Sequence, residues 1–239
     1  MSDQQAVTEM FDDISPRYDF LNHLLSFQID KIWRRKTSRL VAMSQPTAIL
    51  DVATGTADLT IRLAKDIPSA NIIGVDLSEK MLEIGRQKVA QKQLDQHITL
   101  QIADVAHLPF GDNSFDAVTV AFGVRNFEDL ETGLREMLRV AKDHGFIAIL
   151  EFSHPQHSLV KWPYRIYSKH LLPWIGRVFS KHQTAYTYLP SSIEVFTESG
   201  IFMETLKTLG VDDISSKVFS GGIATVYYGH VQKKPTNSQ

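Results

Sequence analysis

The sequence predicts a doubly wound α/β fold, and three observations support this. From Ala48 onward, short apolar runs of strand character alternate with longer segments of helical periodicity. The apolar runs end at polar or glycine-containing turns, as buried parallel strands do. Near the carboxyl end, two further runs at 211–219 and 223–231 flank Ser220-Gly221-Gly222 and predict a hairpin. This order indicates a parallel sheet covered by helices, with an antiparallel last strand.

The elements of this unit follow in order along the chain. Strands are expected at 48–53, 71–75, 98–102, 115–120 and 146–152. A helix should begin beside Asp58, whose carboxylate suits a helix N-terminus. Ser78 should cap the next helix, and a third helix is expected at 131–141. The second of these helices is predicted to bury Met81, Leu82, Ile84, Gly85 and Val89.

Two segments stand outside the alternation. Residues 1–47 are predicted to form an N-terminal helical cap before the α/β domain, 48–239, and residues 155–189 a helical insertion in that domain. From 154 to 182 the chain has five Lys or Arg residues and no Asp or Glu, interleaved with aromatic residues such as Trp174. This mixture suits a substrate lid at a membrane interface. Packing of an amphipathic helix pair on the domain, or on a second copy in a homodimer, is the alternative.

The amino-acid composition limits which classes of protein this chain can belong to. The 239 residues are 43% hydrophobic and 22% charged, as expected of a globular protein with a sizeable core. A net charge of −2 gives no general attraction to nucleic acid, so no such partner is expected. The absence of cysteine excludes disulfides and fits a reducing compartment. Without a secretory signal or a run of about 20 apolar residues, we expect a cytoplasmic protein, with peripheral contact at the inner face of the membrane left open.

A cofactor site is predicted at the end of the first strand, in the run from Asp51 to Asp58. Ala53, Gly55 and Ala57 are small and let a ligand approach the backbone. Thr56 lies between the last two and is expected at the cofactor as well. Asp76 ends the second strand, where its carboxylate can accept hydrogen bonds from both hydroxyls of an adenosine ribose.

The sign of the charge separates the two cofactors that use such an acid. Asp58 would repel the pyrophosphate of a nicotinamide cofactor, and the third glycine typical of those sites is missing because position 60 is Thr. S-adenosylmethionine carries a sulfonium and an ammonium, which Asp51 and Asp58 would favour. The sequence therefore predicts S-adenosylmethionine as cofactor. A nicotinamide-dependent oxidoreductase is the alternative from another class.

Further cofactor contacts are expected after the second and third strands. Asp104 can accept a hydrogen bond from the adenine amino group, with the backbone amide of Val105 beside it. Leu77 and Met81 can pack on the adenine and ribose, although packing in the core would explain both equally well.

Several stretches, in order along the chain, match one known family. They are Tyr18-Asp19-Phe20-Leu21-Asn22 with Ser26, Trp33-Arg34, Asp51 to Asp58, Phe122-Gly123-Val124-Arg125-Asn126, Leu150-Glu151-Phe152-Ser153, Tyr188-Leu189 and Gly221-Gly222-Ile223-Ala224. Through them the chain resembles the ubiquinone/menaquinone biosynthesis C-methyltransferases over nearly its whole length. The resemblance implies a class I S-adenosylmethionine-dependent methyltransferase with a Rossmann-like sheet.

The implied reaction is methylation of a ring carbon of a polyprenylated quinol. Demethylmenaquinol would give menaquinol, or a benzoquinol would be methylated in ubiquinone synthesis. The ring, the tail length and the proton acceptor stay open. Two departures concern the cofactor: many members have glycine at Ala57, and Ala121, which is also expected at the cofactor, stands where the family has a serine contact.

The chemistry requires loss of a hydroxyl proton, because only then is the ring carbon a good nucleophile. Arg125 is expected to stabilise the phenolate, directly or by activating a water, while Asn126 and Tyr18 orient the oxygens. Asp19 and Asn22 lie one helical turn apart and are expected at the substrate, although helix capping explains them nearly as well. The expected substrate contacts also include Phe122, Trp174 and Glu151, which could instead be the partner of Arg125. No metal is required.

Overall fold

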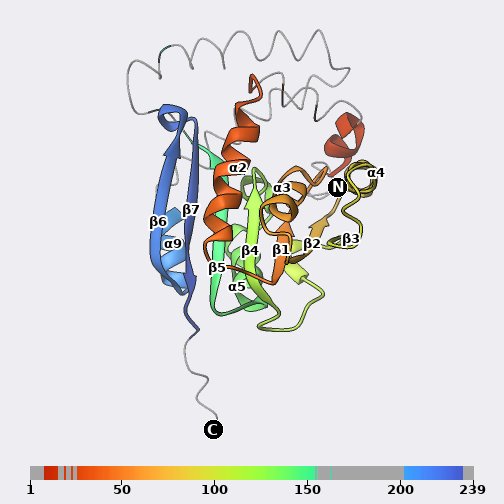
Figure 1. Ribbon diagram of the computed structural model, residues 1–239. Coiled ribbons are helices and arrows are strands. Elements are labelled where there is room, and N and C mark those ends of the chain that lie inside the picture. The colour runs from red at the N-terminus through yellow and green to blue at the C-terminus, as the bar shows by residue number, and fades with distance from the viewer. Residues whose placement is uncertain are drawn as a thin grey trace.

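The computed structural model describes residues 8–15, 19, 23, 26–153, 155, 162 and 202–233 (Figure 1). Tyr18, Asn22 and Trp174 lie outside the described residues. So does the predicted insertion 155–189, apart from Pro155 and Trp162.

The centre of the fold is a seven-stranded sheet of order β3-β2-β1-β4-β5-β7-β6. Pairing is parallel from β3 to β5, and β7 runs antiparallel to both β5 and β6. The strands are β1 (Ala48–Val52), β2 (Asn71–Asp76), β3 (Ile98–Ile102), β4 (Phe115–Ala121), β5 (Ala141–Phe152), β6 (Val211–Phe219) and β7 (Ala224–Val231). The predicted doubly wound sheet with an antiparallel last strand is confirmed.

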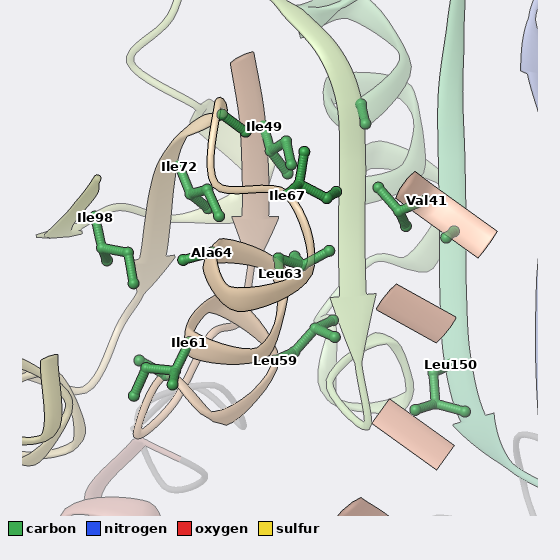
Figure 2. Packing of buried hydrophobic residues seen from close by; sticks show 14 of the residues in the cluster. Val41, Ile49, Leu59, Ile61, Leu63, Ala64, Ile67, Ile72, Ile98 and Leu150 are labelled. Atoms are coloured by element: carbon green, nitrogen blue, oxygen red, sulfur yellow. The ribbon is translucent and has the colours of Figure 1, made fainter. Parts of the chain in front are cut away.

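Helices cover both faces of this sheet (Figure 1). One face carries α2 (Ile29–Ala42), α3 (Asp58–Asp66) and α4 (Glu79–Gln91), and the other carries α5 (Leu130–Val140) and α9 (Phe202–Leu209). Figure 2 shows the apolar side chains of α3 lying between Ile72 and Ile98 on one side and Val41 and Leu150 on the other. No helix in the described part of the chain is long and apolar enough to cross a membrane.

Local signals place the helix ends near their expected positions. The Ser78 hydroxyl accepts a hydrogen bond from the Met81 amide at 3.2 Å and caps α4, as predicted. Four of the five expected core positions of α4 are buried, and Ile84 is half-buried. Residues 8–15 are also helical. The described residues include three short 3₁₀ turns: η1 (Val105–His107), η2 (Val124–Asn126) and η4 (Ser220–Gly222), the last of which joins β6 to β7.

The predicted boundary between the third helix and the fifth strand is wrong. We expected the helix to include Ala141 and the strand to begin at 146, but α5 ends at Val140 and β5 begins at Ala141. Ala141 pairs with Phe115 of β4, and an irregularity in the register separates this pair from the next. Helical periodicity does not register such a pairing, because it depends on a strand more than twenty residues away.

Asp116 of β4 ties the start of β1 to β5. One oxygen, Oδ2, accepts hydrogen bonds from the Thr47 amide (2.9 Å), the Thr47 hydroxyl (2.7 Å) and the Ala48 amide (2.9 Å). Lys142 donates to Oδ1 at 2.6 Å. Partial burial would raise the pKa of Asp116, but these donors outweigh it and hold the pKa well below its ordinary value. The ionised carboxylate therefore stabilises the folded sheet.

We expect Asp116→Asn to lower the free energy of unfolding at pH 7 by about 1.5–3 kcal/mol, the value of hydrogen bonds to a charged group. A carboxyl group with a lowered pKa in the folded state stabilises at pH above its unfolded pKa, and this contribution disappears as pH falls through the folded pKa. The difference between variant and wild type should therefore shrink in strong acid. Urea titrations at pH 7 and at stepwise lower pH measure it. Asp112→Asn, at an exposed carboxylate, is the control, and a pH-independent difference would contradict the assignment.

Candidate active site

The loop that follows β1 has alternate residues in the left-handed conformation. The φ angles of Ala53, Gly55 and Ala57 are 49°, 56° and 65°. These are the three positions whose small side chains predicted a close ligand approach. A Cβ built on Gly55 would meet no heavy atom within 4 Å. Gly55 therefore leaves open space at the carboxyl edge of the sheet, where open α/β sheets bind their ligands.

Asp51, in β1, is a buried carboxylate held by three hydroxyl groups. Thr54 of the loop donates at 2.8 Å, Thr60 of α3 at 2.6 Å and Thr119 of β4 at 2.7 Å. Burial raises the pKa of Asp51 against the opposing effect of these hydrogen bonds and of the Arg34 charge. The loop, the first helix after it and the neighbouring strand are thereby connected through one side chain.

Asp76 at the end of β2 faces the same loop. Its Oδ2 accepts a hydrogen bond from the Gly55 amide at 2.8 Å, and its Oδ1 accepts one from the Ser78 amide at 2.9 Å. Burial raises the pKa of Asp76, and the backbone amides oppose that rise. Because each carboxylate oxygen can accept more than one hydrogen bond, Asp76 keeps capacity for a hydroxyl-bearing ligand.

Asp58, whose negative charge the sequence predicts to favour a cationic cofactor, is itself paired with a cation, Lys88. Lys88 of α4 donates to Asp58, to Asp19 at 2.7 Å and to the Thr56 hydroxyl at 3.1 Å. The Thr56 hydroxyl in turn donates to Asp19 at 2.5 Å. Burial would raise the pKa of Asp58, but Arg34 and Lys88 together hold it below its ordinary value. Asp19 therefore connects the chain before β1, which we call the N-terminal segment (residues 1–47), to the loop. This contact differs from both predicted roles of Asp19, helix capping and substrate binding.

A cavity open to solvent lies over these residues. Ten of the eleven predicted cofactor residues line it: Asp51, Ala53, Gly55, Thr56, Asp58, Asp76, Leu77, Met81, Val105 and Ala121. Asp104 is not among the lining residues, and its side chain caps η1 by accepting a hydrogen bond from the Ala106 amide at 2.9 Å. Met81 is almost fully buried, whereas Leu77 is 37% exposed. Leu77 thus has apolar surface available to a ligand.

Only some of the predicted catalytic and substrate residues line the cavity. Phe122 and Asn126 line the cavity, while Arg125, Glu151 and Asp19 do not. Arg34 of α2 also lines it, although the sequence reasoning assigned it no role. Its only signal in the sequence was the Trp33-Arg34 pair among the stretches shared with the family.

Phe122, directly after β4, has a φ of 61°, a conformation that non-glycine residues rarely adopt. Its ring packs on Phe152 with ring centroids 4.5 Å apart and on Trp33 with centroids 6.1 Å apart. Trp33 is anchored by a hydrogen bond from its Nε1 to the Ser220 hydroxyl at 2.9 Å. An aromatic wall built from α2, β5 and the end of β4 therefore lies beside the cofactor loop.

Arg125 and Glu151 form a buried ion pair behind that wall. The side chains are 4% and 0% exposed, and Nη1 lies 2.6 Å from the carboxylate oxygen. Nη1 also donates to the Phe122 carbonyl oxygen at 2.6 Å. Within the described part of the chain, the buried Nε has no hydrogen-bond acceptor. The predicted pairing of Glu151 with Arg125 is confirmed, and its contact with substrate stays a prediction.

His23, Asp30 and Asp58 place ligand-type atoms within 4.8 Å of one another. Asp30, however, accepts from Arg34, and Asp58 accepts from Lys88. Because these cations already neutralise both carboxylates, the cluster is explained by ion pairing.

We expect Arg125→Ala to destabilise the protein by about 3–5 kcal/mol, because it leaves the Glu151 carboxylate buried and unpaired. The double variant Arg125→Gln/Glu151→Gln should recover most of that loss, since a neutral amide pair can form hydrogen bonds. Denaturant titrations of both variants measure the difference.

Arg135→Ala breaks the exposed pair with Glu131 (2.5 Å) and is the matched control, with little expected change. A single variant no less stable than the double variant would contradict the buried pairing.

Comparison with known proteins identifies the family. The model of the ubiE/COQ5 methyltransferase family matches residues 1–231. The demethylmenaquinone methyltransferase of Bacteroides fragilis is 42% identical over 223 residues, which cover 93% of this chain and 91% of that protein. The ubiquinone/menaquinone biosynthesis C-methyltransferase UbiE of Geobacter sulfurreducens is 45% identical over 226 residues, which cover 94% of this chain and 88% of that protein.

Solved structures support the fold. A SAM-dependent methyltransferase from Aquifex aeolicus matches with a TM-score of 0.56 and 19% identity over 77% of this chain and 82% of that one. The [4+2]-cyclase SpnF matches with a TM-score of 0.65 and 19% identity over 93% and 78%. A cyclase on the same fold shows that fold alone does not decide the reaction. The family model and relatives above 40% identity agree over nearly the whole chain. The chain therefore belongs to the ubiE/COQ5 methyltransferase family, and its cofactor is S-adenosylmethionine.

Proposed function

We propose that this chain methylates a ring carbon of a polyprenylated quinol, converting demethylmenaquinol to menaquinol. The observation that supports this proposal most directly is that one cavity is lined both by the loop after β1 and by Phe122 of the aromatic wall, together with Asn126. The name of the Bacteroides fragilis relative, demethylmenaquinone methyltransferase, supports the same acceptor. A nicotinamide-dependent oxidoreductase is not favoured by family membership.

The residues of the cavity fit the donor. Asp76 has free accepting capacity for the ribose hydroxyls, and Leu77 offers exposed apolar surface for the adenine ring. The open space beside Gly55 lets the donor lie directly on the backbone. When bound, S-adenosylmethionine supplies a methyl group activated by its sulfonium.

On the acceptor side, the protein must orient a flat aromatic ring and favour loss of its hydroxyl proton. The Phe122 ring provides an apolar surface for stacking, and Asn126 places an amide on the cavity wall. The charge of Arg125 is largely cancelled at long range by Glu151. Any effect of Arg125 on the acceptor must therefore come from short-range hydrogen bonding, directly or through a water. Nε is the N–H of Arg125 that has no acceptor among the described residues, but it is buried and Arg125 does not line the cavity, so this bond requires Nε to become accessible when the acceptor binds.

The proposal also includes the surroundings of the substrate. A quinol with a long isoprenoid tail resides in a membrane, so we infer peripheral contact at the inner membrane face through residues 155–189. Trp174 and the basic residues of that segment are the candidates for the contact. A homodimer packed through the same segment is the competing arrangement.

Purified protein supplied with labelled methyl donor should label a demethylated naphthoquinol acceptor far faster than a benzoquinol acceptor. Both acceptors are offered separately, in reduced form and with equal tails, and the labelled product is measured by its retention and mass. Preferential labelling of the benzoquinol would overturn the naphthoquinol assignment while keeping quinol methylation. If neither ring is labelled although the donor binds, the acceptor class is wrong.

Arg125 should act in the chemical step more than in donor binding. In the Glu151→Gln background, which avoids an unpaired buried carboxylate, Arg125→Gln should lower turnover on the order of 100-fold. Donor affinity measured by calorimetry should be nearly unchanged. Turnover should recover partly at higher pH, because there the quinol ionises without assistance.

The control for this experiment is Arg135→Gln in the Glu131→Gln background, which neutralises an exposed pair of similar geometry. Normal turnover in the Arg125 variant, or a defect confined to donor affinity, would show that Arg125 does not assist the acceptor.

A further inference from the structure

Arg34 is held at the cavity by a chain of contacts within the N-terminal segment. Asp30, which is 3% exposed, accepts hydrogen bonds from His23 Nδ1 at 2.8 Å and from the Ser26 hydroxyl at 2.6 Å, and also from Arg34 Nη1. The guanidinium carbon lies 5.1 Å from the centroid of the Phe122 ring. The Arg34 side chain is 12% exposed. Asp30, itself held by His23 and Ser26, and the Phe122 ring thus hold a nearly buried cation at the cavity.

The charges around the cavity are unequal. Three carboxylates line it, those of Asp51, Asp58 and Asp76, and Arg34 is the one Lys, Arg or His side chain among the described residues of the lining. The positive charge of Arg34 reaches the loop, because it helps lower the pKa of Asp58 and opposes the rise in the pKa of Asp51. No ion pair within 4 Å joins Arg34 to either of them.

S-adenosylmethionine has a matching set of groups. Its ribose hydroxyls need an acceptor, its ammonium and sulfonium favour carboxylates, and its α-carboxylate needs a cation. Burying a carboxylate without a partner is costly, so a site that takes the whole donor must offer one. A guanidinium has five N–H donors, and Asp30 engages only one nitrogen, so a second carboxylate can be bound.

We propose that Arg34 binds the α-carboxylate of S-adenosylmethionine, with Asp30 and Phe122 holding the guanidinium in place. This inference rests on the proposed methyl-donor site and adds the group that recognises the amino-acid end of the donor. It also gives the N-terminal helix α2 a direct part in cofactor binding, which the α/β unit alone cannot supply.

The test is calorimetry of the full-length protein with three ligands: S-adenosylmethionine, its decarboxylated analogue and 5′-methylthioadenosine, which lacks the amino-acid part. Arg34→Met should weaken S-adenosylmethionine about 10- to 100-fold, the effect of losing hydrogen bonds between charged groups. It should leave the affinity for the other two ligands nearly unchanged. Wild type should prefer S-adenosylmethionine over the decarboxylated analogue by a similar factor.

Two further variants provide the controls. Arg39→Met removes an exposed cation from the same helix and should change no affinity. Asp76→Asn should weaken all three ligands alike, because all three carry the ribose. If Arg34→Met does not fold, Arg34→Gln, which can still donate to Asp30, replaces it.

Equal loss on all three ligands would show that Arg34 only holds the fold, and would overturn the proposal. Unchanged affinity with reduced turnover would overturn it as well, and would assign Arg34 to the acceptor. If wild type binds none of the three ligands, the proposed methyl-donor site is refuted. That result differs from an equal loss of affinity for all three ligands in the Arg34 variant, which refutes only the role of Arg34.

Discussion

The buried carboxylate of Asp51 is the constraint on which the site depends. A carboxylate that is 1% exposed must have its oxygens satisfied, because an unpaired buried charge costs several kcal/mol in a protein interior. Its three hydroxyl donors come from the loop, from α3 and from β4. Satisfying one side chain therefore sets the positions of all three elements relative to β1. The open backbone at Gly55 and the facing carboxylate of Asp76 follow from that arrangement.

A second layer of charge pairing attaches the N-terminal segment to this centre. Lys88 lies between Asp58 at the start of α3 and Asp19 of the N-terminal segment, and Arg34 lies between Asp30 and the cavity. Because these side chains are largely shielded from water, their interactions are screened less than those of exposed pairs. The N-terminal segment thus completes the cavity and brings a positive charge to a site that would otherwise be acidic. In this arrangement α2, which precedes the sheet, contributes a charged side chain to the lining of the cavity.

Arg125 illustrates how burial changes the meaning of a functional motif. On the cavity wall, a guanidinium would act through its full charge; behind Phe122 and paired with Glu151, its charge is mostly cancelled. Its remaining interaction is a directional hydrogen bond: Nη1 donates to the carbonyl oxygen of Phe122, a residue in a left-handed conformation. The pair therefore supports the geometry of the aromatic wall, and Nε has no acceptor among the described residues. Removing Arg125 alone would leave Glu151 without its cation, so the proposed role of Arg125 in the reaction is tested in the Glu151→Gln background.

The sequence alone determined the class of fold and the position of the cofactor loop. Alternating periodicities predicted the parallel strands, and the small residues at 53, 55 and 57 marked the positions that are left-handed in the structure. These features are local, so a single chain segment carries the whole signal. The pairing of Ala141 with Phe115, the neutralisation of Asp58 by Lys88 and the arrival of Arg34 at the cavity could not be predicted in this way. Each joins residues at least seventeen positions apart, and only the packed tertiary structure, through close-range pairing and burial, decides which distant side chains meet.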